Sequence, residues 1–232
     1  MPKHLATCPK PLCSSCQLGK AHRTATPSPG KLLDAGNLHP GDCVSVDQLE
    51  CNTPGSVPTS RGTPTKCTFQ AATLFCDHAS RFIHLTCHSS TGAVDVIASK
   101  RAFEWEAQLA NVTIKKYKAD NGIFNWASWR TTCELLQQTT DYCGVNAHHQ
   151  NGITERQIHT IVDSARMMLL HAMHKWPDVV TVTLWPYALR LAADIHNATP
   201  GLSGLSPTEI FAGTKDKNRL RDFIPLVAWS LS

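Results

Sequence analysis

Three acidic side chains in this sequence have the type and the surroundings of metal ligands. Asp47 lies late in a segment that predicts a strand, and Asp120 lies at the end of another such segment. Glu155 follows Asp120 by 35 residues and lies near the start of a long predicted helix. Carboxylate oxygens are ligands that Mg²⁺ prefers, and two such ions about 3.5–4 Å apart can activate a nucleophilic oxygen and stabilise a leaving oxygen. Together the three acids therefore predict metal-dependent phosphodiester chemistry.

Each acid also has an ordinary structural interpretation. Asp120 begins the run Asp-Asn-Gly, which on its own is a good turn sequence. Glu155 alone can be an acid on a helix surface, and Asp47 alone can be an acid at a sheet edge. The metal interpretation depends on convergence of the three carboxyl groups at one end of a sheet. It is lost if Glu155 points to the opposite side of its helix from Asp120.

The segments that would position these acids alternate between strand and helix patterns. The strands are predicted over 42–51, 67–76, 81–88, 113–119 and 139–145, with a turn at 77–80 between the second and the third. The helices are predicted over 92–110, 127–137, 151–176 and 181–196. Three adjacent strands followed by alternating helices and strands indicate an α/β fold rather than a sandwich or a bundle.

The clearest helix pattern begins near Asn151-Gly152 and ends before Pro177. Its apolar residues recur at steps of three and four, which indicates one buried face: Ile158, Ile161, Val162, Ala165, Leu169, Ala172 and Trp176. A separate polar stripe lies roughly a quarter turn away at 100° per residue. It contains Glu155, His159, Asp163 and Arg166.

The composition is that of an ordinary globular protein. The chain has 232 residues, of which 42% are apolar and 17% charged, so one large domain or one medium domain with a small appendage is expected. This composition excludes a fibre or a largely disordered chain. The sequence shows neither an apolar run long enough to span a membrane nor a secretory signal. The 10 Cys are therefore expected to be reduced and intracellular.

The charge is unevenly distributed along the chain. Residues 1–31 contain no acid and five basic residues: Lys3, Lys10, Lys20, Arg23 and Lys31. Because the whole chain has a net charge of +4 and this arm carries +5, the residues after it sum to −1. A basic arm on a near-neutral body favours contact with phosphate, and the alternative is an arm that is simply solvated.

Several short runs accompany the three acids. The long helix contains Asn-Gly-x-x-Glu-Arg and, after it, Ala-Arg-x-Met-Leu. Further runs are Asp77–Arg81, Leu184–Ala188, His196–Pro200 and Ser206–Gly213. With the 35-residue interval between Asp120 and Glu155, these runs resemble the D,D-35-E catalytic core of retroviral and retrotransposon integrases. The resemblance is closest to copia-type long-terminal-repeat retrotransposons and covers about residues 2–222.

The resemblance implies a ribonuclease H-like fold, with a five-stranded mixed sheet flanked by helices. It divides the chain into a basic arm with a remnant zinc module and linker over 1–40, a catalytic core over 41–213 and a tail over 214–232, as in a copy truncated at both ends. It also implies that Asp47, Asp120 and Glu155 bind two Mg²⁺ or Mn²⁺ ions. No protein nucleophile is required, because the 3′-hydroxyl of element DNA attacks a phosphodiester of target DNA.

The same resemblance implies the partners and the place of action. Element DNA ends and a target duplex are the expected ligands, and further copies of the chain are expected in the assembly. The protein would act in the nucleus and without a membrane. The candidates for contact with the DNA backbone are Lys115, Lys116, Lys118 and His159. A solvated strand edge is the alternative interpretation of the three lysines.

Asp77 competes with Asp47 as the first metal ligand, because it also follows an apolar segment. The family pattern treats the corresponding residue as structural, at the turn after the second strand. There an Asx-type hydrogen bond suits an aspartate. Asp77 is therefore left out of the predicted site.

The pair Cys13-x-x-Cys16 resembles the second half of the family's His/Cys zinc module. A tetrahedral site needs four ligands, and the two His of the family lie upstream of such a pair. Here His4 and Cys8 are possible substitutes, and the alternative is a pair of reduced thiols without metal. A redox pair is disfavoured because no βα unit surrounds it. We expect that two thiolates alone do not hold zinc stoichiometrically.

Two departures from the family pattern bear on DNA contact. Ile158 and His159 replace an Asn and a basic residue of the commonest pattern, and a His contacts phosphate less reliably than an Arg. The tail over 223–232 matches little that the family shows. A non-catalytic DNA-binding or assembly remnant of a decayed element is therefore an alternative function. A ribonuclease H shares the fold and the metal chemistry, and the paired Asp-Asn-Gly and Asn-Gly-x-x-Glu-Arg runs argue against it.

Overall fold

The computed structural model describes residues 14–15, 38–56, 67–120, 122–142 and 152–214. Within these ranges, the side chains of residues 123 and 152–155 lie outside the description. The divisions predicted at residues 40 and 213 stay a prediction. No helix in the described ranges is both long and apolar enough to cross a membrane.

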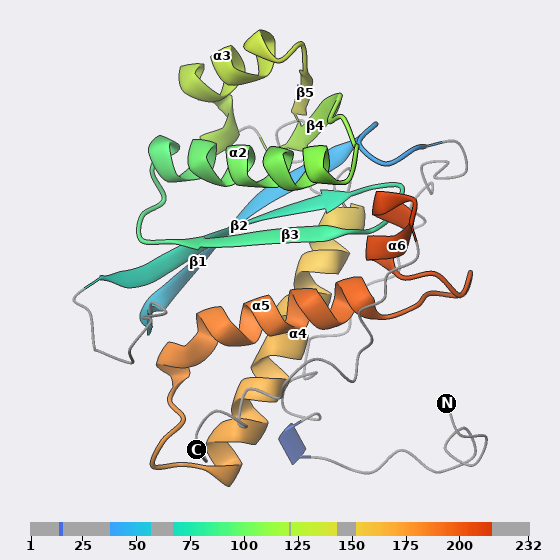
Figure 1. Ribbon diagram of the computed structural model, residues 1–232. Coiled ribbons are helices and arrows are strands. Elements are labelled where there is room, and N and C mark those ends of the chain that lie inside the picture. The colour runs from blue at the N-terminus through green and yellow to red at the C-terminus, as the bar shows by residue number, and fades with distance from the viewer. Residues whose placement is uncertain (1–13, 16–37, 57–66, 121, 143–151, 215–232) are drawn as a thin grey trace.

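The centre of the fold is one five-stranded sheet in the order β3-β2-β1-β4-β5. Its strands are β1 (Val44–Ser56), β2 (Thr68–Asp77), β3 (Ile83–His88), β4 (Lys116–Ala119) and β5 (Thr139–Tyr142). β1, β2 and β3 pair antiparallel, whereas β4 pairs parallel with both β1 and β5. The mixed sheet confirms the ribonuclease H-like architecture that the motifs predicted (Figure 1).

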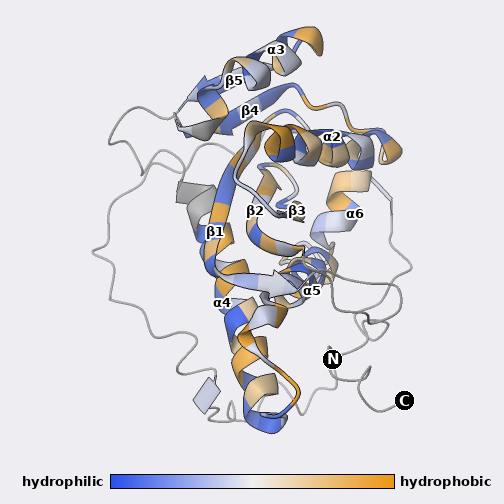
Figure 2. Ribbon diagram, turned by 90° about the vertical axis from the view of Figure 1, so that its left-hand side faces the viewer, coloured by the Kyte–Doolittle hydropathy of each residue, from blue (hydrophilic) through white to orange (hydrophobic). Residues whose placement is uncertain are grey.

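Helices cover both faces of this sheet (Figure 1). They are α2 (Ala93–Leu109), α3 (Ala127–Leu135), α4 (Gly152–Lys175), α5 (Trp185–Ala198) and the short α6 (Pro207–Ala212). Single 3₁₀ turns, η3 (Ile123–Asn125) and η5 (Val182–Leu184), precede α3 and α5. Seen along the sheet, the helices form two outer layers with the strands between them (Figure 2).

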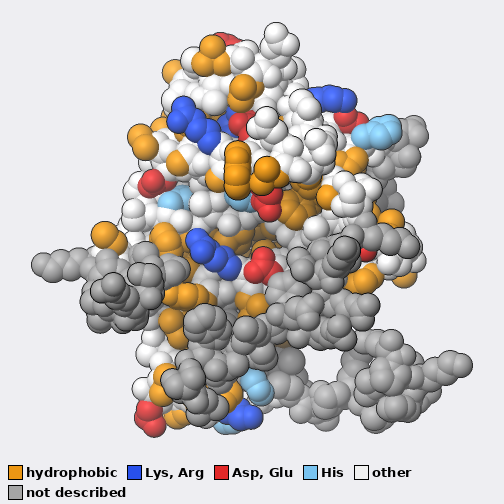
Figure 3. Space-filling model, in the orientation of Figure 1, with side chains coloured by type: hydrophobic (Ala, Val, Ile, Leu, Met, Phe, Trp, Pro, Cys, Tyr) orange, Lys and Arg blue, Asp and Glu red, His pale blue; other side chains and the backbone are white. Residues whose placement is uncertain are grey.

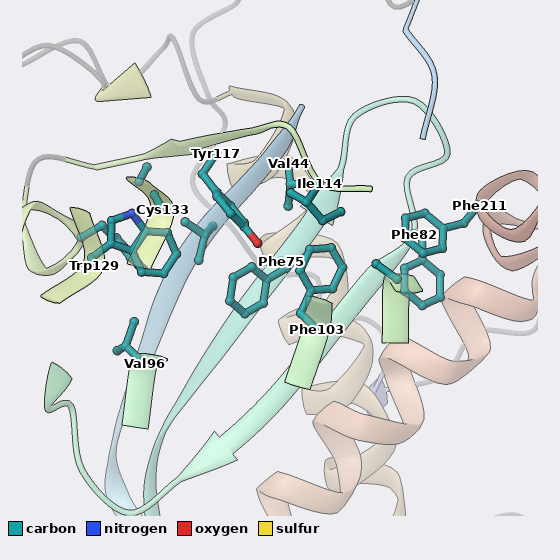
Figure 4. Packing of buried hydrophobic residues seen from close by; sticks show 14 residues of the cluster. Val44, Phe75, Phe82, Val96, Phe103, Ile114, Tyr117, Trp129, Cys133 and Phe211 are labelled. Atoms are coloured by element: carbon teal, nitrogen blue, oxygen red, sulfur yellow. The ribbon is translucent and has the colours of Figure 1, made fainter. Parts of the chain in front are cut away.

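Each face of the sheet has its own hydrophobic core. The first core lies under α2, α3 and α6 and is rich in aromatic rings, which Figure 4 shows stacked between the strands and the helices. In it, Phe75 stacks on Phe103 at 4.9 Å and Phe82 stacks on Phe211 at 4.5 Å between ring centroids. The second core joins β2 and β3 to α4 and α5, chiefly through aliphatic side chains and Trp185.

The first strand is longer than its sequence predicted. Asn52-Thr53-Pro54-Gly55 was expected to end it, but β1 continues to Ser56 with a register shift between Glu50 and Gly55. The extension is held by residues distant in sequence, since the Trp185 indole donates to the Thr53 carbonyl at 2.9 Å. A side chain at Gly55 would meet Pro186 at 2.5 Å, so only glycine allows this close packing. The run Leu184–Ala188 thus packs against the end of the β1–β2 hairpin and supports it.

The fourth strand is shorter than predicted. Residues 113–115 pack against Gly41 and do not take part in the regular strand pairing. The Lys115 amide donates to the Gly41 carbonyl at 2.9 Å, and a Cβ at Gly41 would lie 2.3 Å from the Thr113 carbonyl oxygen. Gly41 also has a φ of +86°, which other residues rarely adopt. Regular pairing therefore begins only at Lys116.

Two further family-like runs have structural roles. Asn197 clamps the start of β3, because its amide nitrogen donates to the Ile83 carbonyl at 2.7 Å and its amide oxygen accepts from the Ile83 N–H at 2.9 Å. Ser206 and Glu209 form a reciprocal capping box at the start of α6. These motifs therefore stabilise the fold and need no chemical explanation.

Candidate functional site

The register of the central strands relates two of the three predicted acids. Val44 lies opposite Tyr117, and Ser45 lies opposite Lys118, in the parallel pair β1–β4. Continued by two residues, this register would put Asp47 opposite Asp120, which follows the last residue of β4. Neighbouring strands lie about 4.8 Å apart, so the register predicts that the two acids are close.

Both acids belong to the sheet face that α4 and α5 cover. Side chains alternate along a strand, and Val44 and Val46 belong to the core on the α2 face, whereas Leu49 packs against the α4–α5 core. Asp47 therefore shares the face of Leu49. In β4, Tyr117 and Ala119 belong to the α2 face, so the next position, Asp120, returns to the α4 face.

The backbone of Glu155 lies in the first turn of α4, and its side chain is outside the described part. Ile158 and Val162, three and seven residues later, pack in the core beneath α4. At 100° per residue, position 155 lies within about 60° of both on the helix. Position 155 thus lies at the border between the buried stripe and the polar stripe of α4, one turn before Ile158.

The immediate surroundings of the two strand acids are polar and partly open. Asp47 is half-buried, and its Oδ1 accepts from the Gln48 N–H at 2.8 Å. Asp120 is exposed, and its Oδ1 accepts from the Gly122 N–H at 3.3 Å, as in an Asx turn. The turn interpretation and the ligand interpretation of Asp120 are therefore compatible, because the turn uses one carboxylate oxygen.

Among the side chains that the structure describes, no three His, Cys, Asp or Glu residues form a group that could hold a metal ion. The Glu155 side chain is not part of that set. Convergence of all three acids therefore stays a prediction. So does zinc binding, since Cys13, Cys16, His4 and Cys8 lie outside the described residues.

Asp77, the acid left out of the site, is a structural residue. It is fully buried, and its carboxylate accepts from the Gly41 N–H at 2.8 Å and from both the N–H and the hydroxyl of Ser80 at 2.7 Å. These bonds hold the turn between β2 and β3 against the start of β1. A carboxylate so occupied is a poor candidate for a metal ligand.

Two of the lysines predicted to contact DNA, Lys115 just before β4 and Lys116 at its start, are partnered by acids. The Lys115 ammonium lies 2.7 Å from Asp42, and Lys116 pairs with Asp141, which raises the pKa of Lys116. Lys118 is half-buried, and His159 is exposed on α4 one turn after Glu155. Exposed ion pairs are worth less than about 1 kcal/mol, so phosphate can displace them. DNA contact by these residues stays a prediction.

Charges do not form a single-sign patch on the face drawn in Figure 3. There Lys and Arg side chains are interspersed with Asp and Glu among the described residues. Near the predicted site, the lysine–acid pairs of β4 repeat this pattern. Non-specific attraction of DNA to this part of the chain is therefore expected to be modest.

Sequence reasoning missed a buried histidine next to the site. His78 is 3% exposed, its Nε2 lies 2.6 Å from the hydroxyl of Ser45, and Ser45 lies opposite Lys118. Burial, with smaller contributions from Arg81 and Lys118, lowers the pKa of His78 from 6.5 to about 4. The only sequence signal was its place in the Asp-His-Ala-Ser-Arg turn.

The lowered pKa of His78 predicts that the folded protein loses stability in mild acid. Above the unfolded pKa of 6.5, His78 is neutral in both states and contributes nothing to the pH dependence. As the pH falls from 6.5 towards 4, only the unfolded chain binds the proton, so the free energy of unfolding decreases. Between about pH 7.5 and about pH 5 we expect a loss of about 2 kcal/mol from this residue. Urea titrations of wild type and His78→Gln measure it, and equal pH dependence in both would contradict the assignment.

Comparison with known proteins finds likeness in structure and none in sequence. No family model and no curated protein matches the chain. The catalytic core domain of HTLV-2 integrase, solved in complex with magnesium, aligns with a TM-score of 0.50 at 16% identity, over 75% of this chain and 98% of that one.

Two further solved structures agree with it. The catalytic core domain of BIV integrase aligns with a TM-score of 0.51 at 15% identity, over 75% of this chain and 95% of its own. A simian T-cell lymphotropic virus intasome aligns with a TM-score of 0.58 at 12% identity, over 92% of this chain and 68% of that chain. Identities this low establish the fold alone. The chain therefore has the ribonuclease H-like fold of retroviral integrase catalytic cores.

Proposed function

We propose that this chain is the integrase catalytic core of a copia-type retrotransposon polyprotein, and that it joins the 3′ ends of element DNA to target DNA. The observation that carries the proposal is the β1–β4 register. Continued by two residues, this register would put Asp47 opposite Asp120 on the sheet face that α4 covers, and Glu155 belongs to the first turn of α4.

The donor set fits hard divalent cations. Asp47, Asp120 and Glu155 would hold two Mg²⁺ or Mn²⁺ ions through carboxylate oxygens. When bound, such ions supply activation of a nucleophilic oxygen and stabilisation of the leaving oxygen in phosphodiester transfer. The complex of the HTLV-2 integrase core with magnesium supports a divalent cofactor for this chain.

The protein's own contribution is rigid positioning. β1 and β4 are interior strands of the sheet, so neither Asp47 nor Asp120 depends on a loose edge for its place. Lys116 and Lys118 on β4, and His159 on α4, flank the acids and would orient the DNA backbone. The proposed ligands are element ends and a target duplex, bound by more than one copy of the chain in the nucleus. The intasome among the structural neighbours supports an oligomer.

A branched oligonucleotide tests this function most directly, because reversal of joining asks little of DNA positioning. We expect Mn²⁺-dependent disintegration of the branch by the purified chain, and weak strand transfer into free duplex. The weakness has two causes: Lys115 and Lys116 are already paired with acids, and a His stands at position 159. Product formation resolved on denaturing gels, with and without metal, measures both reactions.

The second candidate function is a non-catalytic DNA-binding or assembly remnant. The interspersed charges and the lysines of β4 that already pair with acids favour it, because both weaken the hold on a DNA duplex that strand joining requires. If the folded protein shows no metal-dependent reaction on the branched substrate, this candidate replaces the first.

A further inference from the structure

An apolar groove lies between α4 and α5. Its volume is about 600 Å³. Its apolar lining comes from both helices: Ile161, Met167, Met168, Ala192 and Ile195. A groove of this size between two packed helices is large enough to take side chains from another segment.

Four of the polar residues that line the groove have hydrogen-bond partners within the fold. Thr160 and Ser164 donate to carbonyls one turn earlier in α4, at 2.8 and 2.7 Å. Thr199 does the same in α5, and His196 Nε2 donates to the Arg81 carbonyl at 3.0 Å. The groove therefore offers an occupant mainly apolar contact, and apolar side chains are what it is suited to bind.

One residue of the N-terminal arm lines this groove. Ser15 is only 7% exposed, although it is remote in sequence from both helices. Ser14 and Ser15 have helical backbone, and this short piece lies near the C-terminal half of α4 in both ribbon views (Figures 1 and 2). These two residues of the arm are thus placed beside the groove.

We propose that the α4–α5 groove binds the chain's own segment 12–18, Leu-Cys-Ser-Ser-Cys-Gln-Leu. Leu12 and Leu18 each lie three residues from Ser15 in the sequence, one on either side of it. The two leucines and two thiols of this segment are apolar groups of the kind that the methionine and isoleucine side chains of α4 and α5 suit. The occupant and the groove match in polarity.

The length of the connecting chain favours binding within one molecule. Residues 16–37 separate Ser15 from Leu38, and 22 residues can span up to about 70 Å. Such a tether gives a local concentration on the order of millimolar, so weak apolar contacts suffice.

Cys13 and Cys16 report docking directly, because both lie in the proposed segment. We expect a bulky maleimide to label them at least about tenfold more slowly than the exposed thiol of Cys67 in the full chain, with EDTA present to exclude metal. Peptide mass spectrometry resolves the sites. Cys76 and Cys87 are buried and stay unlabelled while the protein is folded.

One variant in the groove and one in the segment test whether the segment binds in the groove. Ser164→Trp fills the groove, and Leu18→Asp puts a charge on the segment, so each should raise labelling of Cys13 and Cys16 to the rate of Cys67. Arg166→Trp, on the exposed opposite side of α4, is the matched control and should change nothing. If Ser164→Trp unfolds the protein, the buried thiol of Cys76 becomes labelled and shows it. In that case the labelling of Cys13 and Cys16 in Leu18→Asp alone tests the proposal.

The proposal is overturned if Cys13 and Cys16 of wild type react as fast as Cys67, or if the folded Ser164→Trp and Leu18→Asp variants keep the protection. Dilution from about 50 μM to about 0.5 μM should leave the protection unchanged, since an intramolecular contact does not depend on concentration. Protection that disappears on dilution assigns the groove to the arm of a second copy instead. None of these results depends on DNA chemistry, so the proposed function is tested separately.

Discussion

Replacing Asp120 with Asn should reduce the metal-dependent reaction on a branched DNA substrate by at least about 100-fold. The amide has the shape of the carboxylate, and its oxygen can still accept the Gly122 N–H that the Asp120 Oδ1 accepts at 3.3 Å. The turn is therefore kept and only the negative charge is removed. Hard divalent cations need that charge, so the ligand set fails while the fold remains.

A second measurement distinguishes a loss of metal binding from a loss of DNA binding. Titration calorimetry with Mn²⁺ and without DNA should show weaker binding in Asp120→Asn than in wild type. Asp178→Asn, in the exposed turn after α4, is the matched control and should bind and react as wild type does. If Asp120→Asn reacts as fast as wild type, the activity comes from a contaminant and the assignment of Asp120 is wrong.

Local pattern was enough to predict the elements that position the site. The predicted strand 67–76 is β2 at Thr68–Asp77, and the predicted helix 151–176 is α4 at Gly152–Lys175. Both have apolar periodicity strong enough to decide element type without tertiary context. The Asx-type hydrogen bonds predicted for Asp77 are present as well, because its partner Ser80 is close in sequence.

Features that depend on distant residues could not be predicted. The extension of β1 to Ser56 rests on Trp185 and Pro186, about 130 positions away, and no pattern in residues 52–55 contains that information. The β1–β4 register likewise follows from pairing of two strands that are separated in the chain by two other strands and a helix. The spacing of the acids predicts a common site, and the register supports it without showing the contact.

One misleading residue lies on the buried face of α2. Lys100 follows Val96 by four positions and precedes Phe103 by three, so helical periodicity assigns it to the core, whereas its charge suggests the surface. The structure agrees with periodicity, since Lys100 is fully buried. Its ammonium lies 2.7 Å from both Glu104 Oε1 and Gln138 Oε1, and 5.2 Å from the centre of the Tyr117 ring.

Replacing Lys100 with Met should lower the free energy of unfolding by about 3–5 kcal/mol. Met keeps most of the volume, so the loss reflects charge rather than a cavity. Glu104 would remain as a carboxylate, 16% exposed, with only the Tyr117 hydroxyl at 2.8 Å and the Gln138 amide at 2.6 Å as donors. Urea denaturation measures the change, and Arg101→Met, on the exposed side of the same helix, is the control.

The double variant Lys100→Met with Glu104→Gln distinguishes an unpaired charge from lost packing. The neutral amide introduced by Glu104→Gln no longer needs a cation and still accepts from the Tyr117 hydroxyl, so the double variant should recover at least about 1 kcal/mol relative to Lys100→Met. Burial, followed by the Glu104 carboxylate, raises the pKa of Tyr117, and Glu104→Gln should lower that pKa again. If Lys100→Met is as stable as wild type, or the double variant is the less stable of the two, the buried Lys100–Glu104 pair does not stabilise the packing of α2 against Tyr117.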